Sequence, residues 1–170
     1  MRRVPIVILG LVAAMFAASA FSANLFSANS SSKNLPSKKY LNQAAIKPMV
    51  AAAEAKAKEL NVNVSICVVD ESGTLLFLEK GDGVSVVTLQ FAQKKARHAA
   101  FYGKPSKDAV DTVKGGNVAA MAFPDYFPSQ GGVPIQLDGQ TLGGIGVSGA
   151  PSSEVDQAVA QAGLDAFLKD

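Results

Sequence analysis

The fold is decided by residues 131–167, which read GGVPIQLDGQTLGGIGVSGAPSSEVDQAVAQAGLDAF. Residues 133–137 and 141–148 have the composition of strands, and the Asp138-Gly139 pair between them favours a two-residue hairpin turn. Glycines are frequent in the second strand. Because glycine has no side chain, they predict either a backbone that another element approaches closely or tight turns.

A helix is predicted to follow this hairpin and to end near Leu168. Ser153 is the candidate N-cap, and Asp156 three residues later gives a weak form of the capping box. The first N–H groups of a helix have no partner within it and favour anions. We therefore expect a position that could bind a carboxylate or phosphate at Ser152, Ser153 and Glu154.

A first helix and a first hairpin are predicted upstream. Residues 40–60 are dominated by Ala, Glu, Lys and Leu, which favours a helix. Pro48 either begins this helix or kinks it. Residues 62–69 alternate like a strand, and residues 74–79 return as a second strand after a polar turn.

The central helix is predicted over residues 85–102, with Ser85 as N-cap and Gly103 and Pro105 as stop signals. One stripe on it predicts close packing and consists of small or apolar residues: Leu89, Ala92, Ala96, Ala99 and Ala100. Spacings of three and four residues place aromatic, basic and imidazole groups together on a second stripe: Phe91, Lys94, Lys95, His98 and Tyr102.

The order of these elements predicts an α+β domain over residues 38–170. Strands that occur in hairpins pair antiparallel, so we expect a largely antiparallel sheet with helices packed on it. Residues 121–128, MAFPDYFP, contain too much proline for a regular element. Their aromatic content predicts a loop that covers an apolar surface.

The N-terminus has the three-part pattern of a secretory signal peptide. Arg2 and Arg3 precede an apolar run, and residues 18–20 form a small-residue cleavage site. We interpret residues 1–20 as the signal peptide and residues 21–37, rich in Ser and Asn, as a flexible leader. The protein is therefore expected to be exported, either periplasmic or extracellular. An uncleaved membrane anchor is the alternative, because no charge interrupts the apolar run.

Charge and cysteine content exclude several classes of site. The chain has 16 basic and 14 acidic residues, and loss of Arg2 and Arg3 with the signal peptide leaves 14 of each. A near-neutral chain does not support a nucleic-acid partner. Cys67 is the one cysteine, so neither an intrachain disulfide nor a multi-cysteine metal site can form. We expect Cys67 to be a buried apolar residue.

Three motifs in sequence order resemble those of the HbpS/GlcG family, which is described as haem-degrading and is related to the C-terminal domain of PduO-type proteins. They are VNVSICVVDESGTLLFLEKGDG at residues 62–83, KKARHAAFYGKPS at residues 94–106, and the stretch at residues 131–167. The resemblance implies a profilin-like fold, a five-stranded antiparallel sheet between helices, and a homo-oligomer. It also implies haem binding, which several members share. Pro48 and the proline-rich, aromatic segment at residues 123–128 depart from the family pattern.

His98 is the one histidine, so metal sites that need two histidines lose a required ligand. Taken with the resemblance, His98 is the candidate axial ligand of haem iron, since haem needs a neutral imidazole, aromatic walls and cations for its propionates. The candidate cations are Lys94, Lys95 and Arg97. The candidate aromatic contacts are Phe91, Phe101 and Tyr102.

Other sites have weaker support. Met121 and Tyr126 are alternative axial ligands, since both residue types occur in that role. Residues 144–149 match G-x-G-x-x-G, but no βαβ unit surrounds them, which indicates coincidence. Ser148 lacks the second glycine of a nucleophile elbow, although a Ser-His-Asp site remains open.

Three hypotheses on function follow. The first is an exported module that binds haem in order to sequester or sense it. The second is an enzyme or accessory protein for a small carboxylated metabolite, bound at the helix N-terminus near Ser153. The third is an oligomeric interaction module without a ligand. The sequence offers no convincing set of catalytic residues, which weighs against the second hypothesis.

Overall fold

The computed structural model describes residues 37–169. The predicted signal peptide and residues 21–36 of the predicted leader lie outside this range. No helix within residues 37–169 is both long and apolar enough to cross a bilayer. The elements, in chain order, are α1 (Gln43–Glu59), β1 (Ser65–Asp70), β2 (Leu75–Lys80), α2 (Val87–Tyr102), α3 (Ser106–Lys114), the 3-10 helix η1 (Val118–Ala122), β3 (Gly132–Leu137), β4 (Gln140–Ser148) and α4 (Ser153–Phe167).

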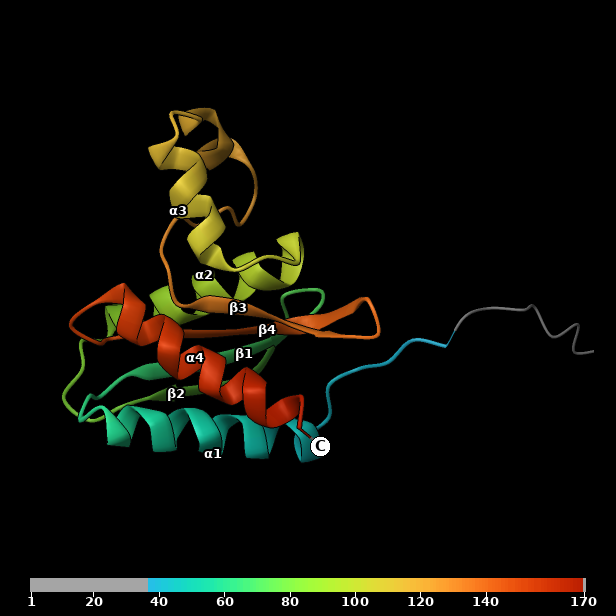
Figure 1. Cartoon of the computed structure of the whole chain (residues 1–170), viewed down its shortest axis with the longest axis vertical. Helices are drawn as coiled ribbons and strands as arrows, with labels where there is room; N and C mark the ends of the chain where they lie inside the picture. Colours follow the sequence, from blue (N-terminus) through green and yellow to red (C-terminus); the bar gives the residue numbers. More distant parts are fainter. Residues whose placement is uncertain (1–36, 170) are drawn as a thin grey trace, which may run out of the picture. The chain divides into compact units, whose positions relative to one another are not determined.

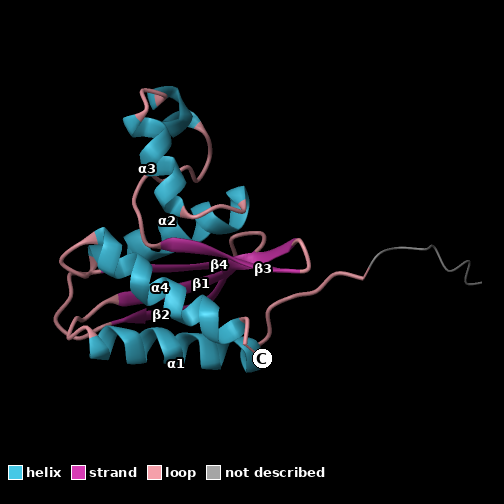
Figure 2. Ribbon diagram, in the orientation of Figure 1, coloured by secondary structure: helices cyan, strands magenta, loops and turns pink. Residues whose placement is uncertain are grey.

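The strands form one antiparallel sheet in the order β2-β1-β4-β3 (Figure 2). Both predicted hairpins are confirmed, as are the α+β class and the antiparallel pairing. The expected fifth strand is wrong for residues 37–169, since the sheet there has four. Between α3 and β3 the chain forms η1 and then a loop with Pro124 and Pro128. Proline has no N–H to donate to a strand ladder, which disfavours a strand there.

Helices cover both faces of the sheet (Figure 1). Helices α1 and α4 lie side by side on one face, where the larger core includes Ile66 and Val68 of β1. Helix α2 lies on the other face, against Cys67 and Val69. Alternate side chains of β1 therefore belong to the cores on opposite faces of the sheet. Cys67 is fully buried, as expected.

The glycines of β4 bring α2 unusually close to the sheet. A Cβ added to Gly146 would lie 2.1 Å from the Ala92 carbonyl oxygen, and one added to Gly144 would lie 2.3 Å from that of Ala96. Both alanines are fully buried. The small-residue stripe and the glycine-rich strand are thus two sides of one close contact, as the sequence predicted.

Two predicted helix starts need correction, and for the first helix the structure decides between the two alternatives for Pro48. Helix α1 begins before Pro48, with Asn42 as its N-cap, so Pro48 lies inside the helix. Helix α2 begins at Val87 without a side-chain cap, and the Ser85 carbonyl instead accepts from the Thr88 hydroxyl. Helix α4 is capped by Ser152, one residue earlier than predicted, because Asp156 is used elsewhere.

Candidate functional site

His98 lies on α2 and is almost completely buried, with 2% of the residue exposed. Tyr102, one turn further along α2, stacks on the imidazole with ring centroids 4.7 Å apart. Tyr126 meets the imidazole edge-on at 5.0 Å from the loop before β3. The His98 imidazole therefore contacts two tyrosine rings, one from α2 and one from the loop before β3.

A hydrogen bond determines which nitrogen of this imidazole carries the proton. The backbone N–H of Phe127 donates to Nδ1 of His98 over 3.1 Å. Burial lowers the pKa of His98 below its ordinary value, against the opposing effects of the Asp125 backbone and the Asp108 charge. The ring is therefore neutral at pH 7. Because Nδ1 accepts a hydrogen bond, the single ring proton belongs on Nε2.

The aromatic loop, residues 123–130, is held against α2 by further polar contacts. Arg97 binds the Asp125 carboxylate through two nitrogens, at 2.7 and 3.0 Å, and also donates to the Gly73 carbonyl. The Tyr102 hydroxyl donates to the Pro124 carbonyl over 2.7 Å. These contacts hold the loop against the His98 side of α2, where Tyr126 and Phe127 lie against the rings of His98 and Phe91.

A cavity of about 260 Å³ opens beside His98. It lies between the end of α2, α3 and the aromatic loop. Its walls include His98, Tyr102, Lys104, Asp108, Ala109 and Tyr126. Sequence reasoning missed Lys104 and Asp108, because the chain turns at Gly103 in a left-handed conformation and the helical spacing from His98 ends there.

A second surface lies on the outer side of the same helix. We call it the α2 face and define it by Phe91, Lys94, Arg97 and Phe101 of α2 with Phe127 of the loop. Phe91 and Phe127 have ring centroids 5.8 Å apart, and the Lys94 ammonium lies 5.5 Å from the Phe127 ring. The Arg97 guanidinium lies 5.0 Å from the Phe101 ring. A shallow hollow of about 320 Å³ runs beside Lys94 and Arg97.

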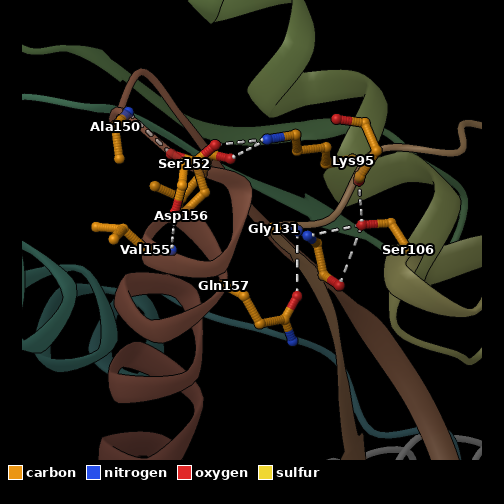
Figure 3. Close-up of polar contacts among 11 residues, drawn as sticks. Lys95, Ser106, Gly131, Ala150, Ser152, Val155, Asp156 and Gln157 are labelled. Atoms are coloured by element: carbon orange, nitrogen blue, oxygen red, sulfur yellow. Dashed lines mark hydrogen bonds and ion pairs between the residues drawn. The ribbon is translucent and has the colours of Figure 1, made fainter. Parts of the chain in front are cut away.

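Lys95 does not lie with the other predicted site residues, and this part of the expectation is wrong. Its side chain is 2% exposed, and its ammonium bonds to the Asp156 carboxylate and the Val147 carbonyl (Figure 3). Although Lys95 and His98 are three residues apart on α2, the long side chain of Lys95 reaches α4 and is bound there. A propionate could not reach an ammonium that is already buried in an ion pair.

The N-terminus of α4 is a poor anion site. The Ser152 hydroxyl accepts the Val155 N–H, which satisfies one of the free donors. Asp156 accepts the Ala150 N–H, and Ser153 opens the helix beside the exposed Glu154. Two carboxylates in the first turn already supply the negative charge that the helix dipole favours, and they repel a third.

Other candidates gain no support. No group of three histidine, cysteine, aspartate or glutamate side chains within residues 37–169 could hold a metal ion. Met121 is half exposed on η1. His98 bonds to backbone rather than to a serine or aspartate side chain, so a Ser-His-Asp site does not form around it.

The cavity beside His98 is too small for haem, whereas the α2 face has the kinds of residue that haem binding needs. Enclosing sites for drug-sized ligands measure roughly 300–1,000 Å³, and haem lies at the large end of that class, so a 260 Å³ cavity cannot enclose it. The His98 Nδ1 lone pair is used by the loop and Nε2 carries the proton, so neither nitrogen is free for iron. The α2 face offers accessible rings and two cations.

The sequence of this chain is similar to those of known proteins. The model of the family described as haem-degrading protein HbpS-like matches residues 41–165. Protein GlcG of Escherichia coli strain K12 is 35% identical over 111 residues, which cover 65% of this chain and 83% of GlcG.

Solved structures give the same result. A double mutant of Streptomyces reticuli HbpS superposes with a TM-score of 0.71 at 28% identity, covering 78% of this chain and 90% of that one. The crystal structure of a PduOC–haem complex superposes with a TM-score of 0.69 at 26% identity, covering 75% of this chain and 95% of that one. The predicted resemblance is confirmed, and the chain belongs to the HbpS-like family.

Proposed function

We propose that this chain is an exported haem-binding module, which sequesters or senses haem outside the cytoplasm, and that haem lies on the α2 face. Membership of the HbpS-like family and similarity to a PduOC–haem complex support a haem-related function. The observation that carries the proposed location is that aromatic rings and cations lie together on the α2 face. Lys94 lies by Phe127, and Arg97 lies by Phe101.

The dimensions of the α2 face suit a porphyrin. Phe91 and Phe101 are ten residues apart on one helix, which separates them by ~15 Å along its axis. Both rings are about 40% exposed. A flat apolar macrocycle can lie on rings so spaced, with its propionates directed to Lys94 or Arg97. Arg97 is also bound to Asp125, so Lys94 is the freer of the two cations.

His98 enters this proposal as an axial ligand that becomes available when the aromatic loop lifts. Release of the Phe127 N–H frees Nδ1 to carry the ring proton, which leaves Nε2 to bind iron. Tyr102 and Tyr126 would remain the aromatic neighbours of the His98 imidazole. Met121 is not proposed, because it lies on η1 and does not line the cavity.

A haemin titration tests the proposal. The chain lacking residues 1–20 is titrated with haemin, and the visible spectrum is followed. We expect saturable binding that Phe91→Ala and Lys94→Ala each weaken at least about fivefold, the equivalent of ~1 kcal/mol per lost contact. Tyr40→Ala and Lys58→Ala are matched controls at exposed sites outside the α2 face. Absence of saturable binding would overturn the proposal.

The same titration tests the role of His98 as iron ligand separately from the role of the α2 face as the haem-binding surface. His98→Ala is expected to move the absorption bands of the bound haem, because the axial ligand sets the electronic state of the iron. Unchanged bands with intact affinity would remove His98 as ligand and retain the α2 face. Saturable binding that neither face variant weakens would remove the proposed location.

Export and assembly are further parts of the proposal. Export rests on the signal-peptide pattern of residues 1–20. A secreted chain whose mass lacks those residues supports it, and retention of the full-length chain in the cytoplasm contradicts it. A homo-oligomer is favoured by β2, an edge strand of the sheet within residues 37–169, and by its exposed apolar residues Leu75 and Leu78. Light scattering of the mature chain measures the assembly.

A further inference from the structure

Two exposed residues of opposite charge line the cavity beside His98, and neither takes part in an ion pair within residues 37–169. Lys104 follows α2 directly, and Asp108 lies in the first turn of α3. The ion pairs found in this part of the chain use neither side chain. Their neighbours Lys107 and Asp111 are paired with each other on the same helix. The cavity thus has one free ammonium and one free carboxylate at its walls.

The body of the cavity is aromatic and apolar. Tyr102 and Tyr126 meet edge-on at 5.3 Å, and Ala109 supplies a methyl group from α3. The Tyr102 hydroxyl is occupied by the Pro124 carbonyl, which leaves its ring as the surface for contact. Flat molecules bind such surfaces through ring stacking and edge contacts.

The imidazole adds one hydrogen-bond donor. His98 lines the cavity, and its Nδ1 is taken by the Phe127 N–H, so the group left for a ligand is Nε2–H. A neutral imidazole that donates from Nε2 suits a carboxylate or hydroxyl oxygen. It does not suit a metal ion, which needs a lone pair.

We propose that this cavity binds a small hydroxylated aromatic acid, with its carboxylate at Lys104, its ring against Tyr102 and Tyr126, and its hydroxyl donating to Asp108. About 260 Å³ holds a single-ring molecule and excludes haem. The free carboxylate of Asp108 sets the requirement for a donor group, because a purely anionic ligand would place two like charges in one small cavity.

This site is distinct from the α2 face, because Phe91, Lys94, Arg97 and Phe101 do not line it, although His98 belongs to both proposals. It is also distinct from the N-terminus of α4, where the sequence placed a carboxylate-binding position. The two proposals make separable predictions, because Lys94 belongs to the α2 face and Lys104 to the cavity. Occupation of the cavity would stabilise the aromatic loop in its closed position, since Tyr126 belongs to both.

Calorimetric titration of the mature chain with three probes tests the proposal. 4-Hydroxybenzoate carries both polar groups, benzoate lacks the hydroxyl, and phenol lacks the carboxylate. We expect saturable binding of 4-hydroxybenzoate with Kd on the order of 0.1–1 mM, as suits a ligand of about ten heavy atoms, and at least fivefold weaker binding of the other two.

Substitutions locate the site. Lys104→Met is expected to weaken 4-hydroxybenzoate binding at least about fivefold and to leave phenol binding unchanged. Lys107→Met, on the exposed side of α3, is the matched control and should change neither. Haemin binding should be unaffected by Lys104→Met, so failure here is distinguishable from failure of the haem proposal. Absence of saturation by all three probes, or equal affinity of Lys104→Met and the unsubstituted chain, overturns the inference.

Discussion

The ammonium of Lys95 lies 2.8 Å from the carboxylate of Asp156, and only 2% and 6% of the two side chains are exposed. Lys95 also donates to the Val147 carbonyl, and Asp156 accepts the Ala150 N–H (Figure 3). Burial lowers the pKa of Lys95 and raises the pKa of Asp156, while the partner's charge opposes the shift in each case. This pair joins α2 to the end of β4 and the start of α4.

Removing one member of this pair is predicted to be costly. Asp156→Asn should lower the free energy of unfolding by roughly 3–5 kcal/mol, because it leaves the Lys95 charge buried without a counter-ion. Urea denaturation followed by circular dichroism measures the change. Asp111→Asn, in the exposed pair with Lys107, is the control and should cost under ~1 kcal/mol. Equal costs for the two variants would show that the buried pair contributes nothing special.

The close approach of α2 to β4 predicts that Gly146 tolerates no side chain. In Gly146→Ala the new Cβ would meet the backbone of Ala92 and Ala96 at 2.1 and 2.6 Å, so the helix must move. We expect a loss of ~3 kcal/mol or more in unfolding free energy. Gly115→Ala, at the end of α3 with a φ of −73°, should cost within about 1 kcal/mol. A stable Gly146→Ala variant would contradict the described contact.

Cys67 is predicted to be inert in the folded protein. Burial raises the pKa of its thiol to about 12, so roughly one thiol in ten thousand is ionised at pH 8. A disulfide reagent that reports thiols by absorbance should react very slowly with the native chain and at once in concentrated guanidinium chloride. Rapid reaction under native conditions would show that the α2 side of the sheet opens readily.

The lowered pKa of His98 predicts a pH dependence of stability. His98 binds its proton more weakly in the folded state than in the unfolded state, where its pKa has the ordinary value of 6.5. The contribution of His98 to the free energy of unfolding should therefore be fully present above about pH 6.5. It should decrease as the pH falls from there toward the folded pKa.

A comparison with His98→Gln isolates this contribution, since other groups titrate in the same range. The difference in unfolding free energy between the unsubstituted chain and the variant should shrink as the solution is acidified from pH 7. A constant difference would mean that His98 is not held neutral by burial. Amide signals of Phe127 should change over the same range, because protonated Nδ1 cannot accept its N–H.

The sequence predicted most of the architecture because local signals and tertiary packing agree in this chain. Alternation in residues 62–69 and the Asp138-Gly139 turn define the two hairpins correctly. Glycine in β4 and alanine in α2 predict the close contact between them. The helix starts were displaced because capping depends on which side chains the tertiary structure uses. Asp156, for example, pairs with Lys95 instead of forming a capping box with Ser153.

The site was predictable only in part. Helical spacing brought His98 and Tyr102 together correctly, since both lie on α2. The same spacing could not show that the Lys95 side chain reaches α4, because its partner Asp156 lies 61 residues further along the chain. Tyr126, Asp125 and Phe127 reach α2 through an irregular loop, which has no periodicity to reveal its partners.

The central claim is that haem lies on the α2 face, and nuclear magnetic resonance locates it most directly. Gallium protoporphyrin IX, a diamagnetic analogue of haem, is added to the isotope-labelled chain lacking residues 1–20, and the amide shifts are followed. We expect saturable shifts centred on Phe91, Lys94, Arg97 and Phe101, with smaller ones at the aromatic loop. Saturable shifts centred on the α1 and α4 side of the sheet, or none, would contradict it.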